Sequence, residues 1–184
     1  MSKRFTVFII IAVAVILGLV WLFVGPPRQA PRSNVPEIET ITYTNPYFLV
    51  SLTYPAAWQP DANYPKIQDI PTHFTGPDGF FGVDTIGGND TPLTDVVQAL
   101  VSNQSSSFGK NPTMTLAKLG DQEAAFVLPS ADQAKENRGG AAFIARYPKP
   151  ISFDKKTVFY YFVLFADKDH IKNIAETMKF LDGR

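Results

Sequence analysis

The sequence lacks cysteine: none occurs among its 184 residues. This absence excludes disulfide bonds, thiol nucleophiles, cysteine-ligated metal sites and a bacterial lipoprotein anchor, which needs a lipidated cysteine. It is compatible with an exported bacterial domain, because disulfides are optional in a domain of this size.

An excess of charge is also lacking, since 17 basic and 17 acidic residues give a formal net charge of zero. Four of the basic residues precede residue 33, whereas every acidic residue follows it. The rest of the chain is therefore mildly acidic and has no basic cluster. Such a domain is a poor nucleic-acid binder, so we expect no nucleic-acid partner.

Sequence motifs of catalytic and metal-binding sites are absent as well. The chain has only two histidines, His73 and His170, and neither a Gly-x-Ser-x-Gly elbow nor a His-Glu-x-x-His pair. Two stretches, Ser107–Lys110 and Ser152–Lys155, match Ser-x-x-Lys, but the Ser-Asp-Asn and Lys-Thr-Gly companions of that motif are missing. Both stretches are predicted to lie in loops, and we interpret the matches as chance. We predict no catalytic residue.

Two weaker patterns suggest ligand sites. Asp167, Asp169 and His170 cluster closely enough to suggest a metal, but the spacing fits no known metal motif, and helix capping explains the carboxylates more simply. The stretch 87–91 precedes a helix and could hold an anion, yet it lacks the lysine of a phosphate loop. We predict a turn and a cap there, and no bound metal or cofactor.

What the sequence does contain is a long hydrophobic run. From Phe5 to Val24 only Thr6 and Gly18 fall outside the hydrophobic set. As a helix these residues would span ~30 Å, about the thickness of a bilayer core, and no charge opposes insertion. A cleaved signal peptide is the alternative, but the run exceeds the usual core of ~7–15 residues, and no small-x-small cleavage site follows it. We predict one retained transmembrane helix over residues 5–24, which contacts the lipid bilayer.

The flanks of this run predict the topology and the domain layout. Lys3 and Arg4 favour a cytoplasmic N-terminus over residues 1–4, although Arg28 and Arg32 on the other side weaken the bias. Residues 25–36 contain four prolines and predict an extended linker. Residues 37–184 then form one domain, expected to lie outside the cytoplasm at the cell membrane.

The domain sequence is dominated by strand patterns. Alternation and turn residues predict strands over 38–44, 47–54, 71–75, 80–86, 113–119, 123–128, 141–147 and 157–165. Helical periodicity predicts helices over 92–106, capped by Thr91, and over 168–179, capped by Asp167 or Asp169. The run Val158–Phe165 is apolar throughout, so its strand must be covered on both faces. We predict an α+β fold in which a largely antiparallel sheet carries a helix on each face, as in an α/β/α sandwich.

The stretch Tyr47–Trp58, with its Tyr54-Pro55-x-x-Trp58 turn, resembles the opening of PsbP-like domains. Residues 165–181 resemble the closing strand, helix and short last strand of that family, including its membrane-anchored, extracytoplasmic bacterial members. The resemblance implies the α/β/α sandwich expected above and a role as an accessory subunit, and it carries no catalytic residue. Tyr54, Pro55 and Trp58 are structural in it, with Trp58 expected to close one edge of the core.

The sequence thus favours a membrane-anchored accessory or binding domain that engages an envelope protein partner without enzymatic activity. The alternative is a small-ligand sensor or hydrolase whose site combines scattered residues such as His73, Asp84 and Ser51. Neither the partner nor the oligomeric state can be read from the sequence.

Overall fold

The computed structural model describes residues 38–103, 105–137, 139–153 and 156–182. The predicted transmembrane helix (5–24) and proline-rich linker (25–36) lie outside the described residues. Among those that are described, no helix is both long and apolar enough to cross a membrane. The residues from Ile38 onward form one compact unit.

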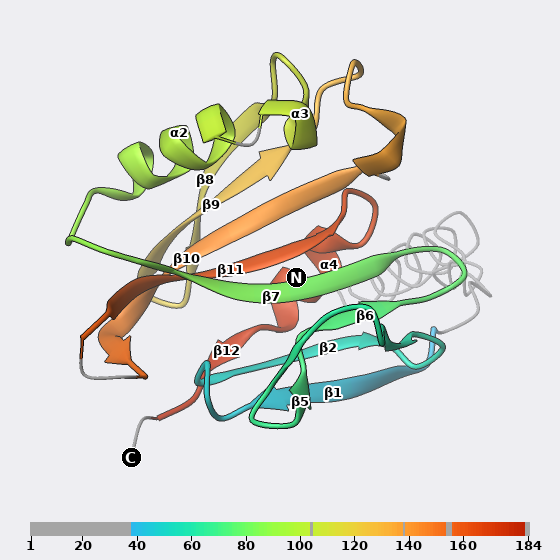
Figure 1. Ribbon diagram of the computed structural model, residues 1–184, viewed down its shortest axis with the longest axis horizontal. Coiled ribbons are helices and arrows are strands. Elements are labelled where there is room, and N and C mark those ends of the chain that lie inside the picture. The colour runs from blue at the N-terminus through green and yellow to red at the C-terminus, as the bar shows by residue number, and fades with distance from the viewer. Residues whose placement is uncertain (1–37, 104, 138, 154–155, 183–184) are drawn as a thin grey trace, which may run out of the picture. The chain divides into compact units, whose positions relative to one another are not determined.

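This unit is built mainly from antiparallel strands (Figure 1). The strands are β1 (Thr40–Asn45), β2 (Val50–Pro55), β3 (Gln59–Pro60), β4 (Lys66–Ile67), β5 (Ile70–Pro71), β6 (His73–Thr75), β7 (Phe80–Gly87), β8 (Thr113–Leu119), β9 (Gln122–Leu128), β10 (Gly140–Ser152), β11 (Val158–Asp167) and β12 (Lys179–Phe180). The helices are α2 (Leu93–Asn103), α3 (Ser105–Phe108), α4 (Ile171–Thr177) and the 3₁₀ helix η1 (Lys135–Asn137).

A seven-stranded sheet in the order β3-β6-β7-β11-β10-β9-β8 forms the middle layer. Strand β11 lies at its centre between β7 and β10, as its continuous apolar sequence predicts. Phe162 and Leu164 point into one core cluster, whereas Tyr161 and Val163 point into the other, and all four are almost fully buried. The prediction of a strand covered on both faces is confirmed.

Helix α2 covers one face of this sheet. Its buried residues Leu93, Val96 and Val97 form the apolar stripe that the periodicity predicts. The predicted helix 92–106 is, however, too long, because α2 ends at Asn103 and the short helix α3 follows. The predicted cap is not seen either, since the Thr91 hydroxyl donates to the carbonyl of Asn89.

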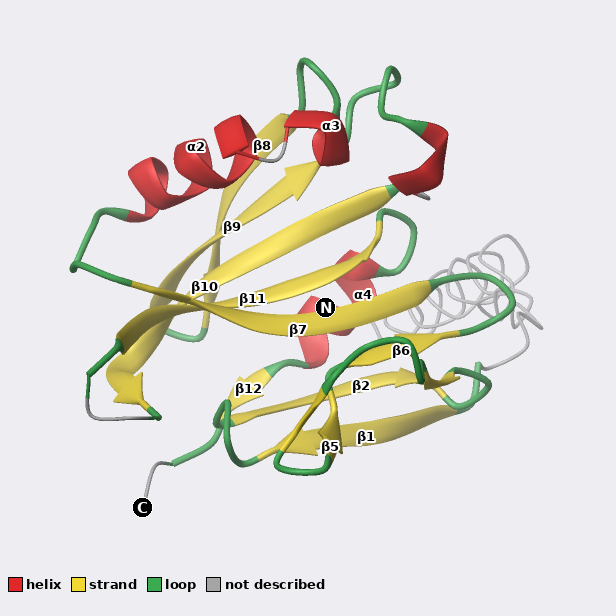
Figure 2. Cartoon of the chain, in the orientation of Figure 1, coloured by secondary structure: helices red, strands yellow, loops and turns green. Residues whose placement is uncertain are grey.

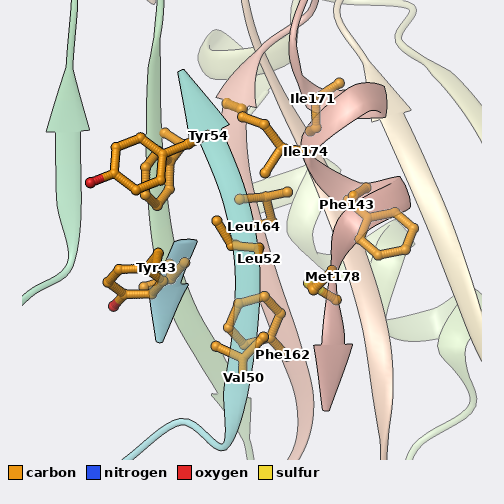
Figure 3. Packing of buried hydrophobic residues seen from close by; sticks show 14 of the residues in the cluster. Tyr43, Val50, Leu52, Tyr54, Phe143, Phe162, Leu164, Ile171, Ile174 and Met178 are labelled. Carbon is orange, nitrogen blue, oxygen red and sulfur yellow. The ribbon is translucent and has the colours of Figure 1, made fainter. Parts of the chain in front are cut away.

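The other face of the sheet is covered by two elements together (Figure 2). Helix α4 packs there, and beside it lies a separate three-stranded sheet in the order β1-β2-β12. Val50, Leu52 and Tyr54 of β2 point into the same core cluster as the inward face of α4 (Figure 3). The alternating face predicted for this strand is thus correct. The prediction of a single sheet is wrong, because sequence alternation does not say which strands pair with which.

Candidate functional site

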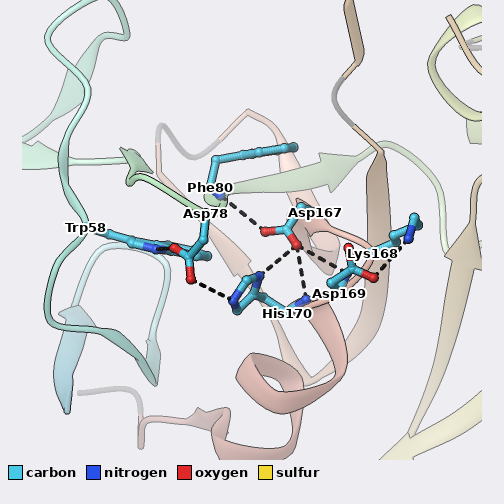
Figure 4. A network of polar contacts seen from close by, with 7 residues as sticks. All are labelled: Trp58, Asp78, Phe80, Asp167, Lys168, Asp169 and His170. Carbon is cyan, nitrogen blue, oxygen red and sulfur yellow. Dashed lines mark hydrogen bonds and ion pairs between the residues drawn. The ribbon is translucent and has the colours of Figure 1, made fainter. Parts of the chain in front are cut away.

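His170 lies at the corner between β11 and α4, between two carboxylates (Figure 4). Its Nδ1 atom is 2.7 Å from Asp167 Oδ1, and its Nε2 atom is 3.5 Å from Asp78 Oδ2. Asp78 also accepts a hydrogen bond of 2.8 Å from the indole N–H of Trp58, which holds the pKa of the Asp78 carboxyl below its usual value. The other oxygen of Asp167 accepts a hydrogen bond from the backbone N–H of Phe80.

This network joins three segments of the fold: the turn after β2, the β6–β7 hairpin and the start of α4. Asp167 Oδ1 accepts hydrogen bonds from the backbone N–H groups of Asp169 and His170, so Asp167 holds the turn that begins α4. Asp169 is paired with Lys168 at the surface. Within the described ranges, no group of three side chains is arranged to hold a metal ion. The hydrogen bonds of Asp167 to the backbone of Phe80, Asp169 and His170 fix this corner of the fold.

The residues of the Tyr-Pro-x-x-Trp turn lie next to this network. Trp58 is fully buried, stacks on Phe81 with ring centroids 6.3 Å apart, and meets the His170 ring edge to face at 5.0 Å. Tyr54 and Pro55 end β2, and both are buried. Trp58 therefore contributes its rings to the core and its N–H group to the polar network.

His73 lies elsewhere, in a cleft of about 480 Å³ that Asp61, Tyr64 and Glu136 also line. Its ring stacks on Tyr64 with a centroid distance of 3.7 Å, and its Nδ1 is 3.2 Å from the hydroxyl of Thr72. Burial lowers the pKa of the imidazole, so His73 is neutral near pH 7.

The structure brings together two of the three residues of the scattered site. Asp84 is exposed on β7, the strand beside His73, and its charge acts to raise the pKa of the His73 imidazole, whereas Ser51 lies on β2 in the other sheet. In the parts of the chain described above, no hydrogen bond connects Ser51 with His73.

The other sequence patterns also have structural roles. In the stretch 87–91, the carboxylate of Asp90 pairs with Arg146, and the carbonyl of Thr91 accepts a hydrogen bond from the Tyr161 hydroxyl. Ser107 lies in helix α3 and not in the predicted loop, and Ser152 ends β10.

A groove of about 750 Å³ lies at one end of the domain, where three segments meet. They are the β1–β2 turn, the end of β10 and the residues around β12. We call it the aromatic groove, and it is lined by Pro46, Tyr47, Leu49, Tyr147, Pro148, Lys149, Pro150, Ile151, Ser152, Phe153, Phe180, Leu181 and Asp182.

A local irregularity in β10 shapes one wall of this groove. Arg146 pairs with Tyr161 and Ile151 pairs with Phe159, so four residues of β10 lie opposite a single residue of β11. The extra residues include Pro148 and Pro150, which have no N–H group to donate to a ladder. The two prolines thus explain why the strand bulges here and opens a concavity at its end.

The opposite wall is the β1–β2 turn, which buried hydrogen bonds hold in place. The side chain of Asn45, fully buried, accepts hydrogen bonds from the backbone N–H groups of Tyr47 and Phe48 at 3.0 and 2.9 Å. Its amide donates to the Tyr43 hydroxyl at 2.8 Å. From the far side, the hydroxyl of Tyr147 donates to the carbonyl of Phe48 at 2.9 Å.

Two features of this turn face the groove. Tyr47 stacks on Phe153 with ring centroids 4.1 Å apart and an interplanar angle of 15°, so a stacked aromatic pair joins the two walls. Leu49 has φ of +51°, a left-handed conformation that is strained for a leucine, and its carbonyl accepts a hydrogen bond from the N–H of Leu181. Strain of this kind persists only where surrounding contacts impose it, and it is concentrated at functional positions.

Sequence reasoning missed this groove. The signal that could have found it is Pro148-Lys149-Pro150, because two prolines directly after an apolar strand predict a bulge. Tyr47 lies in the turn before β2 and not in the strand predicted over 47–54.

The fold and groove define an α+β domain with an aromatic surface depression. No family model matches the chain, and no curated protein matches it. Among solved structures it is similar to the solution structure of cyanobacterial PsbP (CyanoP) from Synechocystis sp. PCC 6803, at 13% identity and a TM-score of 0.44, over 85% of this chain and 99% of that chain.

Proposed function

We propose that this protein is a membrane-anchored accessory domain of PsbP-like fold that binds an extended, proline-containing segment of an envelope protein in the aromatic groove. The observation that carries this proposal is the stacked aromatic pair of Tyr47 and Phe153 in a groove that prolines also line. The membrane anchor is inferred from the apolar run of residues 5–24, and the extracytoplasmic location from Lys3 and Arg4 before that run.

The residues that line the groove favour peptide binding over catalysis. It contains one lysine and one aspartate, Lys149 and Asp182, and is otherwise aromatic, aliphatic, proline or serine. Proline-rich segments prefer aromatic-lined grooves, because their polyproline conformation is already formed and loses little entropy on binding. Tyrosine side chains suit such sites, since the ring contacts the proline and the hydroxyl can bind a backbone carbonyl.

The rigidity of the groove supports the same proposal. The turn that carries Tyr47 is fixed by Asn45 from inside and by Tyr147 from the other wall. A wall that is ordered before binding does not lose conformational freedom when the peptide binds, which improves affinity. The groove also lies one strand length, about 20 Å, from Ile38, where the domain joins its N-terminal segment.

The proposal is tested with the full-length protein in detergent micelles and a panel of fluorescent peptides. The panel contains proline-rich sequences and matched glycine–serine sequences of equal charge, and fluorescence anisotropy measures binding. We expect binding of proline-rich peptides with micromolar dissociation constants, weakened at least about tenfold by Tyr47→Ala, because aromatic anchors contribute most of the energy of such contacts.

The matched control is Tyr64→Ala, which removes a second stacked tyrosine, the partner of His73, outside the groove. Peptide affinity should be unchanged in that variant. Equal binding of proline-rich and glycine–serine peptides, or equal affinity of Tyr47→Ala and the parent protein, would exclude the groove as a peptide site.

A second candidate function is supported by the cleft around His73. A neutral imidazole stacked on Tyr64, with Asp61 and Glu136 in the same cleft, could bind a small polar ligand or accept a proton. Screening ligand and ester-substrate panels against the protein and its His73→Gln variant separates the two functions. Turnover or ligand binding that disappears in this variant, together with no peptide binding, would favour the sensor or hydrolase.

A further inference from the structure

Strand β8 forms one edge of the seven-stranded sheet, and among the described residues it pairs with β9 alone. It carries two of the most exposed hydrophobic side chains in the described residues, with Leu116 at 71% and Met114 at 49% exposure. Both lie opposite residues of β9, Ala125 and Val127, that belong to the core cluster under α2. The two exposed side chains therefore lie on the α2 side of the sheet edge.

The backbone of this edge is also available for pairing. Leu119 lies opposite Gln122 around a two-residue turn, and Gly120 at its first position has φ of +59°. In such a hairpin the closing pair exchanges hydrogen bonds, and the direction of the backbone groups alternates along the strand. Met114, Leu116 and Lys118 therefore direct their N–H and C=O groups to the free edge.

The surface beside this edge has few charges. A groove of about 250 Å³ runs between β8 and α2, and its α2 side is formed by Thr94, Val97 and Gln98. Helix α2 contains a single charged residue, Asp95, in 11 residues. Depletion of charge is a mark of the centre of protein interfaces, whereas a solvated helix face normally carries several charges.

We propose that this edge binds a second copy of the chain, with the two β8 strands antiparallel and Leu116 at the two-fold axis. This inference goes beyond the proposed peptide binding and involves a different surface. In this register Leu116 faces its own copy, and Met114 faces Lys118 of the second chain. Three successive positions with outward backbone groups then pair, and the two sheets become one.

Side-chain chemistry favours a second copy over an unrelated strand. Placing the axis at Leu116 removes the most exposed apolar side chain of the edge from water in both chains at once. It also places the only charged residue of β8, Lys118, opposite a methionine and not opposite its own copy. The aliphatic stem of a lysine packs on such a neighbour while its ammonium group reaches water. No like charges therefore meet across the strand pair.

The absence of cysteine makes the test direct, because any introduced cysteine is the only thiol. Leu116→Cys in the full-length protein, expressed in its membrane and mildly oxidised, should give a disulfide-linked dimer. The Cα atoms of a hydrogen-bonded antiparallel pair lie about 5.5 Å apart, a separation that a disulfide spans. Lys172→Cys is the control, since its side chain is 76% exposed on α4 and lies away from β8, and it should give no disulfide-linked dimer.

A second experiment measures the affinity of the two chains for each other. Leu116→Lys should weaken the dimer of the full-length protein in micelles roughly a hundredfold by analytical ultracentrifugation, because the symmetric interface loses two leucines. Ile38→Lys, at a site with 62% exposure outside this edge, should not change the dimer. A monomeric parent protein overturns the proposal, as do equal cross-linking at residues 116 and 172 and cross-linking of Leu116→Cys to a different polypeptide.

Discussion

Replacement of Asn45 by alanine is expected to destabilise the domain by about 3 kcal/mol. The buried side chain makes three hydrogen bonds, to the Tyr43 hydroxyl and to the backbone N–H groups of Tyr47 and Phe48. Each buried hydrogen bond contributes about 1 kcal/mol, and a donor left without a partner costs about 1–3 kcal/mol. Phe48 is itself buried, so water cannot replace the lost acceptor at its N–H group.

The measurement is equilibrium urea unfolding of the fragment Glu37–Arg184, followed by far-UV circular dichroism. With a slope of about 2 kcal/mol per molar urea, the midpoint should fall by about 1.5 M. Asn63→Ala is the control, because Asn63 bonds to Asp61 in an exposed turn, and it should change stability by less than about 0.5 kcal/mol. A loss below about 1 kcal/mol for Asn45→Ala would show that the turn does not depend on this side chain.

Two further predictions concern the same fragment. Burial lowers the pKa of His73 below its usual value of 6.5, so the unfolded chain binds more protons below that pH. Stability should therefore decrease as the pH falls from 7 through about 6.5, and His73→Gln should reduce this dependence in urea titrations at several pH values. A β-carbon at Gly76 would lie 1.9 Å from the Trp58 ring, so Gly76→Ala should cost about 2–3 kcal/mol and shift the tryptophan emission. Gly120→Ala, which faces open space but has a positive φ, should cost only about 1 kcal/mol and leave the emission unchanged.

The sequence predicts the elements of this fold better than their assembly. Alternation in β2 and the continuous apolar run in β11 report directly on burial, so their inward residues follow from the sequence. The separate β1-β2-β12 sheet does not, because β12 has two residues and its pairing with β2 is a long-range contact. The end of the predicted helix 92–106 differs from the structure by a few residues. The polar sequence after Asn103 does not mark the boundary, because the short helix α3 follows directly in the same polar stretch.

The candidate site was harder to predict than the fold. Searching for catalytic motifs directs attention to His170 and Asp167, which the structure uses to fix a corner. The aromatic groove depends on Tyr47 and Phe153, residues more than a hundred positions apart, and no local pattern reports their stacking. Only the prolines of β10 leave a local signal, because a missing N–H group has a direct consequence for strand pairing.

The pairing of β12 with β2 has a consequence for biosynthesis. Phe180 lies opposite Val50, and the N–H of Leu181 donates to Leu49, so the last residues of the domain complete a sheet begun by its first. These residues must leave the ribosome before this contact can form, and contacts between distant residues form slowly. We therefore expect that the domain acquires its aromatic groove only after residues 179–181 have been released, and that removal of these residues leaves the β1-β2-β12 sheet incomplete.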